Sequence, residues 1–414
     1  MKIFSIRNFL VFIPKEVVSL KKLIKNNVHW VGKIDWELKS FHGEDYSTHK
    51  GSTYNSYLIE EEKTVLIDTV WMPFAKEFVA NLEKEIDISK IDYIVINHGE
   101  VDHSGALPEL MEKIPDTPIY CTANAVKSLK GQYRKDWNFN VVKTGDTLSV
   151  GNGKDLVFVE MPMLHWPDSM AAYLTSDNIL FSNDAFGQHY AIDRLFNDYA
   201  DECTLQEEAI KYYANILTPF SGILKKKLEE IISLNLSIDI IATSHGVIWR
   251  DNPLQIVELY SKWCDNYQEN QITILYDTMW EGTKKLGEAI FEGINLEDKD
   301  VRVKMFHIAK TDKNDLITEV FKSKTVVMGS PTIGNSILTP VAALIHLMKE
   351  LKFKNKKSAA FGCYGWSGES VKVLNEKMKE AGFEIIGDGL RNQWNPTEDA
   401  IKDAIEFGKA IAKA

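Results

Sequence analysis

The feature that most constrains the fold of this chain is a regular alternation of strands and helices that begins near residue 271. Each short apolar run in this part of the sequence is followed by a segment with helical periodicity. The predicted strands cover residues 272–276, 301–308, 325–329, 358–363 and 384–388, and the predicted helices cover 283–291, 314–321, 340–351, 369–381 and 397–413. Five βα units of this length indicate a doubly wound parallel sheet that binds its ligand at the carboxyl ends of the strands.

The part of the chain before residue 270 has a different pattern, in which short strand-like runs dominate. These runs cover residues 53–59, 64–70, 91–98, 118–122, 156–161 and 171–183, and helical segments lie at 74–85 and 204–234. Mixed strands with covering helices indicate a layered α/β domain. We therefore predict an N-terminal extension over residues 1–28, a first domain over 29–265 and a second domain over 266–414.

Composition and charge exclude several classes of protein. The net charge of −11 argues against a nucleic-acid partner. No apolar run approaches the roughly 20 residues that a membrane-spanning helix needs, so we expect no membrane segment. The four cysteines are far apart and form no CxxC pair, which excludes an evident rubredoxin-like or zinc-ribbon site. This cysteine usage is typical of a reducing cytoplasm, where we expect the protein to reside.

A short loop after the apolar run at 91–96 contains four metal-capable side chains within six positions: His98, Glu100, Asp102 and His103. Loops that leave the ends of strands often present ligands. One metal ion needs only three or four protein ligands. Two imidazoles and two carboxylates in so short a loop therefore suggest two metals that share one site, whereas the alternative is a polar surface turn.

Three further residues are candidate partners of this loop because each follows an apolar strand-like run. They are His165, Asp184 and His245. Asp184 is the natural bridge, since one carboxylate can give one oxygen to each of two metals. Mixed imidazole and carboxylate sites suit iron, whereas imidazole-rich sites suit zinc. We also expect His42 and His189 to lie near the metals, as candidate catalytic or supporting groups.

Three loops of the second domain would meet at one edge of its sheet. The first has small hydroxyl residues before a helix start, which can hold a phosphate. The absence of GxGxxG and GxxxxGK motifs excludes the obvious dinucleotide and P-loop interpretations. Together the loops would enclose a phosphorylated planar ring. The candidate binding residues are Thr278, Met279, Trp280, Gly282, Thr283, Ser330, Pro331, Thr332, Ile333, Gly334, Asn335, Tyr364, Gly365, Trp366, Ser367 and Gly368.

The metal motif resembles the His-x-His-x-Asp-His loop of the metallo-β-lactamase superfamily, with Glu100 in place of the second histidine. With the segments 51–57 and 182–189, the stretch from His29 to the C-terminus resembles the flavodiiron proteins. This resemblance implies a metallo-β-lactamase-like αββα domain followed by a flavodoxin-like domain that binds FMN. It also implies two irons: His98, Glu100 and His165 would hold one, Asp102, His103 and His245 the other, and Asp184 would bridge them.

Family members reduce dioxygen to water, nitric oxide to nitrous oxide, or both. The resemblance thus implies an FMN-dependent oxidoreductase that removes dioxygen, and possibly nitric oxide, in an anaerobe. Its expected electron donor is a separate rubredoxin or a reduced deazaflavin coenzyme, and its expected assembly is a head-to-tail homodimer or a tetramer. Two alternatives stay open: a zinc-dependent hydrolase with a regulatory flavodoxin-like domain, and a flavin carrier or sensor with a vestigial metal site.

Overall fold

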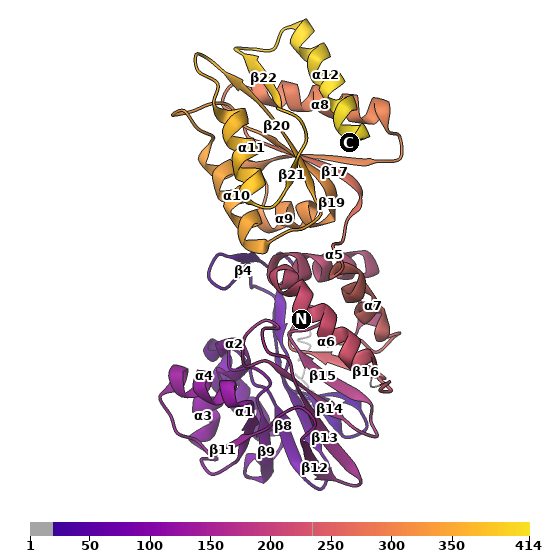
Figure 1. Ribbon diagram of the computed structural model, residues 1–414. Helices are drawn as coiled ribbons and strands as arrows, with labels where there is room; N and C mark the ends of the chain where they lie inside the picture. The colour runs from indigo at the N-terminus through magenta and orange to yellow at the C-terminus, as the bar shows by residue number, and fades with distance from the viewer. Residues whose placement is uncertain (1–19, 234) are drawn as a thin grey trace, which may run out of the picture.

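The structure is a computed structural model that describes residues 20–233 and 235–414. The chain forms two α/β units that lie end to end (Figure 1). The first unit runs from strand β1 to helix α7, and the second runs from strand β17 to helix α12. The predicted boundary at residues 265 and 266 falls in the short connection between Trp263, which ends α7, and Glu269, which begins β17.

The first unit contains two facing sheets. The larger sheet has the strand order β1-β2-β7-β8-β9-β10-β11. Its strands are β1 (Lys22–Lys25), β2 (Val28–Trp30), β7 (Tyr57–Glu60), β8 (Thr64–Ile67), β9 (Ile91–Val95), β10 (Ile119–Cys121) and β11 (Phe139–Val141). The smaller sheet consists of β12 (Thr147–Gly151), β13 (Lys154–Glu160), β14 (Met170–Leu174), β15 (Ile179–Asn183) and β16 (Ile240–Thr243), in that order. Two short pairs complete the strands: β3 (Lys33–Asp35) with β6 (Ser52–Tyr54), and β4 (Ser40–Phe41) with β5 (Tyr46–Ser47).

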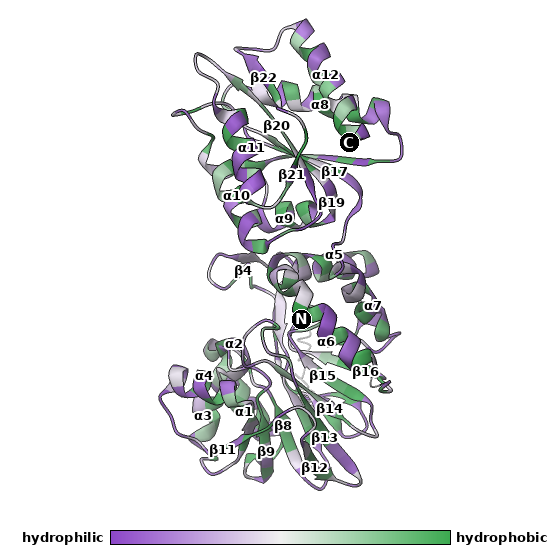
Figure 2. Cartoon of the chain, in the orientation of Figure 1, coloured by the Kyte–Doolittle hydropathy of each residue, from purple (hydrophilic) through white to green (hydrophobic). Residues whose placement is uncertain are grey.

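Helices cover the outer face of each sheet. The larger sheet packs against α1 (Ala75–Glu85), α3 (Leu107–Met111) and α4 (Ala123–Tyr133). The smaller sheet packs against α5 (Glu202–Tyr212), α6 (Ser221–Ser233) and α7 (Leu254–Trp263). Between the sheets lies a core of fully buried side chains from both, such as Val65, Phe158 and Phe181. The strands are accordingly hydrophobic in Figure 2, and the αββα architecture of the prediction is confirmed.

The structure divides two of the predicted strands. The run at 53–59 is split between β6 and β7, and the run at 171–183 is a hairpin of β14 and β15. The polar stretch 175–178 forms the hairpin turn, with positive φ at Ser176 and Asn178. The larger sheet also begins at Lys22, within the predicted extension. The charged strand β1 gives no strong apolar signal, and residues 1–19 lie outside the described residues.

The second unit is a parallel sheet with the order β18-β17-β19-β20-β21, and β22 also pairs with β20. Its strands are β17 (Glu269–Tyr276), β18 (Arg302–His307), β19 (Ser323–Gly329), β20 (Lys357–Tyr364), β21 (Glu384–Ile385) and β22 (Leu390–Gln393). One face is covered by α8 (Gly282–Glu297) and α12 (Glu398–Lys413), and the other by α9 (Lys313–Lys322), α10 (Thr339–Leu351) and α11 (Ser370–Glu380). The prediction of a doubly wound parallel sheet is confirmed, although the polar strand β22 was not predicted.

The two units meet where α5 and the π-helix Tyr213–Leu217 pack against α9. Lys211 Nζ lies 2.6 Å from Asp315 Oδ1, and the Asn314 side-chain amide donates to Asn215 Oδ1 at 2.9 Å. A single apolar core continues from the smaller sheet into the second unit. Among the described residues, no helix has the length and apolarity to cross a membrane.

Candidate metal centre and flavin pocket

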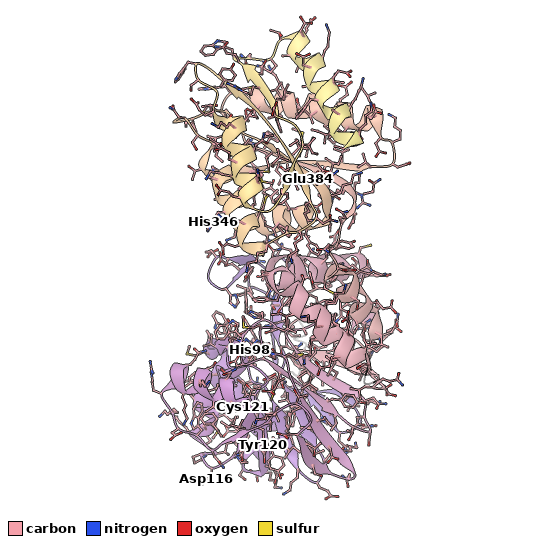
Figure 3. All side chains as sticks on the ribbon, viewed as in Figure 1. His98, Asp116, Tyr120, Cys121, His346 and Glu384 are labelled. Carbon is pink, nitrogen blue, oxygen red and sulfur yellow. The ribbon has the colours of Figure 1, made fainter. Side chains whose placement is uncertain are left out.

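The seven predicted metal ligands come together at one end of the αββα sandwich. His98 and Glu100 leave strand β9, and Asp102 and His103 lie on the short helix α2 (Val101–Ser104). The other three follow strands of the smaller sheet: His165 lies between β13 and β14, Asp184 directly follows β15, and His245 follows β16. Figure 3 shows His98 at the end of the sandwich that is nearer to the second unit. The strand ends of two sheets thus supply one cluster.

One half of the cluster is built around the Oδ2 atom of Asp184. His98 Nε2 lies 3.8 Å from this oxygen, and His165 Nε2 lies 3.5 Å from it. Glu100 Oε2 completes the group, at 3.2 Å from His98 Nε2 and 3.6 Å from His165 Nε2. Two imidazoles and two carboxylates therefore face one small volume.

The other half is built around the second oxygen of the same carboxylate. His103 Nε2 lies 3.2 Å from Asp184 Oδ1, and His245 Nε2 lies 3.5 Å from it. Asp102 Oδ2 is 3.0 Å from His245 Nε2 and 3.2 Å from His103 Nε2. Asp184 thus divides its two oxygens between two sets of histidines, as a bridging ligand between two metals must.

The electrostatics of the cluster fit a pair of cations. Both carboxylate oxygens of Asp184 are buried and have no hydrogen-bond partner of normal geometry. Burial alone would raise the pKa of Asp184, but His103 and His165 hold it well below its ordinary value. Burial would lower the pKa of His103, but Asp102 and Asp184 raise it to about 9. Protons on the imidazoles therefore compensate the carboxylates when no metal is bound, and metal ions would replace that positive charge.

Two hydrogen bonds orient imidazoles toward the centre of the cluster. His98 Nδ1 lies 2.8 Å from Asp168 Oδ1, and His245 Nδ1 lies 2.7 Å from the carbonyl oxygen of Thr53. Because both partners accept hydrogen bonds, both Nδ1 atoms donate, which leaves Nε2 free for a metal. Asp168 was missed in the sequence. It follows Trp166-Pro167 in an ordinary-looking turn, and no spacing links it to His98.

The two further histidines also lie beside the cluster. His42 Nε2 is 2.8 Å from Glu100 Oε1 at the more open side of the site. His189 is buried, and its ring lies 5.4 Å from that of His245. Phe41 packs against both, with ring distances of 4.6 Å to His42 and 4.9 Å to His189. A cleft of about 340 Å³ between the two units reaches His165 and Trp166 from outside.

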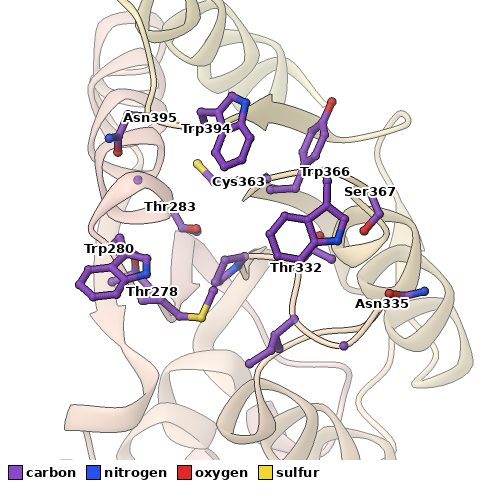
Figure 4. A pocket seen from close by; sticks show the side chains of 17 residues that line it. Thr278, Trp280, Thr283, Thr332, Asn335, Cys363, Trp366, Ser367, Trp394 and Asn395 are labelled. Atoms are coloured by element: carbon purple, nitrogen blue, oxygen red, sulfur yellow. The ribbon is translucent and has the colours of Figure 1, made fainter.

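The second candidate site is a cavity of about 610 Å³ at the carboxyl ends of β17, β19 and β20. Fourteen of the sixteen predicted residues line it: Thr278, Met279, Trp280, Gly282, Thr283, Pro331, Thr332, Ile333, Gly334, Asn335, Tyr364, Gly365, Trp366 and Ser367. In the close-up of Figure 4, Trp280 and Trp366 flank this pocket from opposite sides. The volume suits a cofactor of the size of FMN.

The pocket has the features that a phosphate and a planar ring require. No side chain caps the N-terminus of α8, so its first backbone N–H groups are available to an anion. The buried hydroxyl oxygen of Thr278 has no hydrogen-bond partner among the described residues. At the rim, the side chains of Trp280 and Trp366 are 86% and 87% exposed. A phosphate can therefore bind at the helix while a flat ring packs among aromatic side chains.

Two predicted residues lie behind the wall of this pocket. The buried Ser330 hydroxyl accepts from the backbone N–H of Leu338 and donates to the carbonyl oxygen of Pro331, so it shapes the loop. Gly368 has a φ of +86°, and a Cβ there would lie 2.6 Å from Arg391 Nη2. Three residues that line the pocket were missed: Cys363, Trp394 and Asn395. Trp394 and Asn395 directly follow strand β22. Because the sequence did not predict this strand, it gave no reason to place the two residues at the pocket.

Both parts of the chain match known families. Residues 53–246 match the family described as ODP family beta lactamase, and residues 274–408 match flavodoxin. Two solved structures resemble the whole chain. Rubredoxin oxygen:oxidoreductase from Desulfovibrio gigas is 36% identical with a TM-score of 0.91, covering 95% of this chain and 98% of that one. The flavodiiron protein from Giardia intestinalis is 31% identical with a TM-score of 0.90, covering 95% and 96%.

Curated relatives are more similar in sequence. The anaerobic nitric oxide reductase flavorubredoxin of Citrobacter koseri is 56% identical over 392 residues, which cover 94% of this chain and 81% of the relative. The protein of the same description from Escherichia coli is 57% identical over 392 residues, covering 94% and 82%. Together with the paired metal cluster and the flavin pocket, these similarities show that the chain is an oxidoreductase of the flavodiiron protein family, whose cofactors are FMN and a di-iron centre.

Proposed function

We propose that this protein uses electrons relayed by FMN to reduce nitric oxide to nitrous oxide at a di-iron centre, with dioxygen as a second substrate. In the first reaction, two nitric oxide molecules, two electrons and two protons give one nitrous oxide and one water. In the second, one dioxygen, four electrons and four protons give two waters. The observation that carries the proposal is the division of the two Asp184 oxygens between two sets of histidines.

The residues of the chain position and insulate the reaction. We propose that His98, Glu100 and His165 hold one iron, that Asp102, His103 and His245 hold the other, and that Asp184 bridges them. When bound, FMN supplies stepwise electron transfer and the irons supply open coordination positions for the gas. His42 contacts Glu100 and lies closest to the open side, where we propose that it faces the substrate. Phe41 packs against His42 and Trp166 packs against His98, with ring distances of 4.6 Å and 5.1 Å.

Sequence similarity supports nitric oxide as the first substrate. The relatives described as nitric oxide reductases are 56% and 57% identical to this chain, whereas the relative described as an oxygen oxidoreductase is 36% identical. The similarity to the oxygen oxidoreductase is nevertheless the reason to retain dioxygen as a second substrate. The metal ligands alone do not separate the gases, because the same seven side chains serve both reactions.

We also propose a head-to-tail homodimer, alone or within a tetramer. The residues that line the flavin pocket all follow position 277, and the metal cluster lies between positions 98 and 245, so none of the described residues lines both sites. A partner subunit would bring its exposed Trp280 and Trp366 to the cleft at His165. This arrangement would place one flavin beside the other subunit's irons. A monomer that keeps full turnover at high dilution would contradict it.

The electron donor in this proposal is a rubredoxin-type protein, which the names of both groups of relatives support. A reduced deazaflavin coenzyme is the second candidate. Anaerobic reduction of the flavin by rubredoxin, deazaflavin and NADH, compared by stopped-flow absorbance, discriminates between them. A cytoplasmic location is part of the proposal, and the four free cysteines favour it.

The proposal is tested by rapid anaerobic mixing of the reduced, iron-loaded and FMN-loaded protein with each gas. We expect nitric oxide to reoxidise the flavin faster than dioxygen and to yield nitrous oxide, measured by gas chromatography. Dioxygen should be reduced without release of peroxide. Faster reaction with dioxygen would reverse the order of substrates. A protein that purifies with zinc alone and reacts with neither gas would favour the hydrolase alternative.

A further inference from the structure

A small cavity lies beside the metal cluster, between α5, the β4–β5 pair and α9. Its lining includes His189, Glu208, Lys211, Tyr212, Asn215 and Asn314. The space open to water is about 10 Å³, close to what one water molecule needs. The lining is mixed, but its imidazole, carboxyl, ammonium, hydroxyl and amide groups can offer the two to four polar partners that a buried water needs. The cavity therefore has the size and chemistry to hold a single bridging water.

The inner wall of the cavity reaches the metal cluster through His189. Its Nδ1 lies 2.8 Å from Ser52 Oγ, but its buried Nε2 has no hydrogen-bond partner among the described residues. The His189 ring lies 5.4 Å from the ring of His245 and 5.2 Å from that of Tyr212. His189 thus stands between the cavity and a metal ligand, with one ring nitrogen that still needs a partner.

Tyr212 provides a second connection to the cluster. It is the last residue of α5 and lines the same cavity. Burial, and next the carboxylate of Asp184, raise the pKa of Tyr212 well above its ordinary value. The hydroxyl therefore stays protonated, and it can accept one proton while it donates another.

The outer wall of the cavity is formed by Glu208. Glu208 lies one helical turn before Tyr212 on α5, so both side chains are on the same face. Its side chain is only 9% exposed, and none of the described residues forms a hydrogen bond or an ion pair with its carboxyl group. Lys211, which lines the same cavity, instead contacts Asp315 at 2.6 Å. Glu208 is thus a buried acid that is not neutralised by a partner.

The surroundings of Glu208 set its protonation near neutral pH. Burial raises its pKa to about 7, Lys211 and Lys50 lower it, and Asp315 and Glu207 raise it. These four charged side chains come from α5, from α9 and from the loop before β6. At neutral pH the carboxyl group therefore exchanges a proton readily.

We propose that Glu208 is the residue at which protons enter on their way to the di-iron centre, and that the water in this cavity passes them to His189 and Tyr212. This inference rests on the proposed function, because both gas reductions consume protons. In each cycle the Glu208 carboxyl gives up a proton and becomes a carboxylate. The water accepts that proton and releases another, either to His189 Nε2 while Nδ1 gives its proton to Ser52 Oγ, or to the Tyr212 hydroxyl while that hydroxyl gives up its own proton toward the centre. Solvent at the edge near Lys50 then restores the proton on Glu208.

The test compares three variants of the full-length protein loaded with iron and FMN: Glu208→Gln, Glu208→Asp and the control Glu207→Gln. Glu207 is the exposed neighbour on the same helix, so its variant changes the same charge away from the cavity. The rate of nitric oxide consumption by the reduced protein should fall as the pH rises through 7 in the wild type, because the proton donor is lost. We expect Glu208→Gln to be about tenfold slower at pH 6 and to lack this pH dependence. Glu208→Asp should retain it. Glu207→Gln should keep the wild-type rate at pH 6 and the pH dependence, with a slightly lower midpoint because the Glu207 charge raises the pKa of Glu208.

Infrared difference spectroscopy gives a second measurement that does not depend on turnover. The protonated carboxyl band of Glu208 should disappear as the pH rises through about 7 and should be missing in Glu208→Gln. Iron content and the unfolding midpoint show whether each variant is folded and loaded. If Glu208→Gln fails to fold, the pH titration of the carboxyl band in the wild type still tests whether a buried carboxyl group ionises near pH 7. A Glu208→Gln variant with wild-type rate and pH profile, or a carboxyl already ionised at pH 5, would overturn the proposal. If the wild type reduces neither gas, the proposed function fails, and the infrared titration still reports on Glu208.

Discussion

The metal cluster and the flavin pocket of this chain differ in how they are organised for binding. At the metal cluster, seven charged or polar side chains already lie within contact distance, and the two oxygens of Asp184 are buried. At the flavin pocket, an open cavity of about 610 Å³ is lined by loop residues, and two of its tryptophans, Trp280 and Trp366, are 86% and 87% exposed. A small cation needs a fixed cage of opposite charge, whereas a large ring needs a shaped slot whose rim can also meet another protein.

This difference means that the two sites should respond differently to mutation. Removal of one ligand from a cage of charges leaves other buried charges without compensation, so the loss should be large. Removal of one wall from an open slot costs only the contacts of that wall.

Replacement of Asp184 should have the largest effect, because the proposed bridge would be lost to both metals at once. We expect Asp184→Ala to lower the rate of nitric oxide reduction by about a thousandfold or more, in the range seen when essential catalytic groups are removed. Iron content, measured by atomic emission, should fall below one per chain, while the donor should still reduce the flavin normally. Asp193→Ala, at an exposed position of the same unit, serves as the control. Unchanged iron content in Asp184→Ala would show that the metal cluster tolerates the loss of one side chain as well as the flavin pocket does.

Replacement of Asp168 should weaken the cage without dismantling it. Its carboxylate accepts the hydrogen bond that fixes His98, but it does not face the metals. We expect Asp168→Asn to lower iron affinity by roughly 10- to 100-fold, as is usual for groups that support a metal-binding histidine. Competition with a chelator measures this affinity. Equal affinity in wild type and variant would show that His98 is held in place by packing alone.

Metal binding should also depend on pH, with a sign that follows from the imidazoles. Because the carboxylates of Asp102 and Asp184 outweigh the effect of burial and raise the pKa of His103 to about 9, the metal-free site is protonated at neutral pH. Iron must displace that proton, so affinity should rise about tenfold per pH unit for each proton released, between pH 6.5 and 9. The proton release is measured by calorimetry in buffers of different ionisation enthalpy.

The same shift predicts the stability of the metal-free protein. A histidine whose pKa is raised by folding contributes stability that is complete below its unfolded value of 6.5 and is lost as the pH rises through about 9. The urea midpoint of the metal-free protein should therefore fall over this range relative to that of the loaded protein. A constant difference between the two forms would contradict the assignment.

The smallest effect is expected at the rim of the flavin pocket. Trp366→Ala should weaken FMN binding only a few-fold, since one aromatic contact is worth about 1 kcal/mol. Fluorescence titration of the FMN-free protein measures this affinity. Trp36→Ala removes a tryptophan that is 54% exposed in the first unit and should leave FMN affinity unchanged. A more than hundredfold loss of FMN affinity in Trp366→Ala would show that the flavin pocket is as sensitive to a single substitution as the metal cluster.

The contrast between the sites also explains what the sequence could predict. Four of the proposed metal ligands lie within six positions and the other three follow strands, so residue type and spacing were enough to find the cluster. The residues that support it left no such signal. Asp168 and Glu208 look like ordinary polar residues in a turn and on a helix, and only the fold brings them to His98 and to the cavity.

The central strands of the fold could be predicted from the sequence, but the edge strands could not. Long apolar strands such as β17 and β20 indicate a parallel sheet, because strands of this kind are buried on both faces. The edge strands β1 and β22 are short and rich in polar or charged residues, so their sequences resemble loops. Trp394 was missed as a pocket residue for this reason, since its position depends on β22.

We propose that seven side chains hold two irons with the Asp184 carboxylate between them. Anomalous diffraction at the iron absorption edge, from crystals of the loaded protein, would locate these irons. We expect two iron peaks about 3.5 to 4 Å apart, one beside His98 and His165 and the other beside His103 and His245. A single peak, a zinc signal in place of iron, or peaks away from Asp184 would contradict the account.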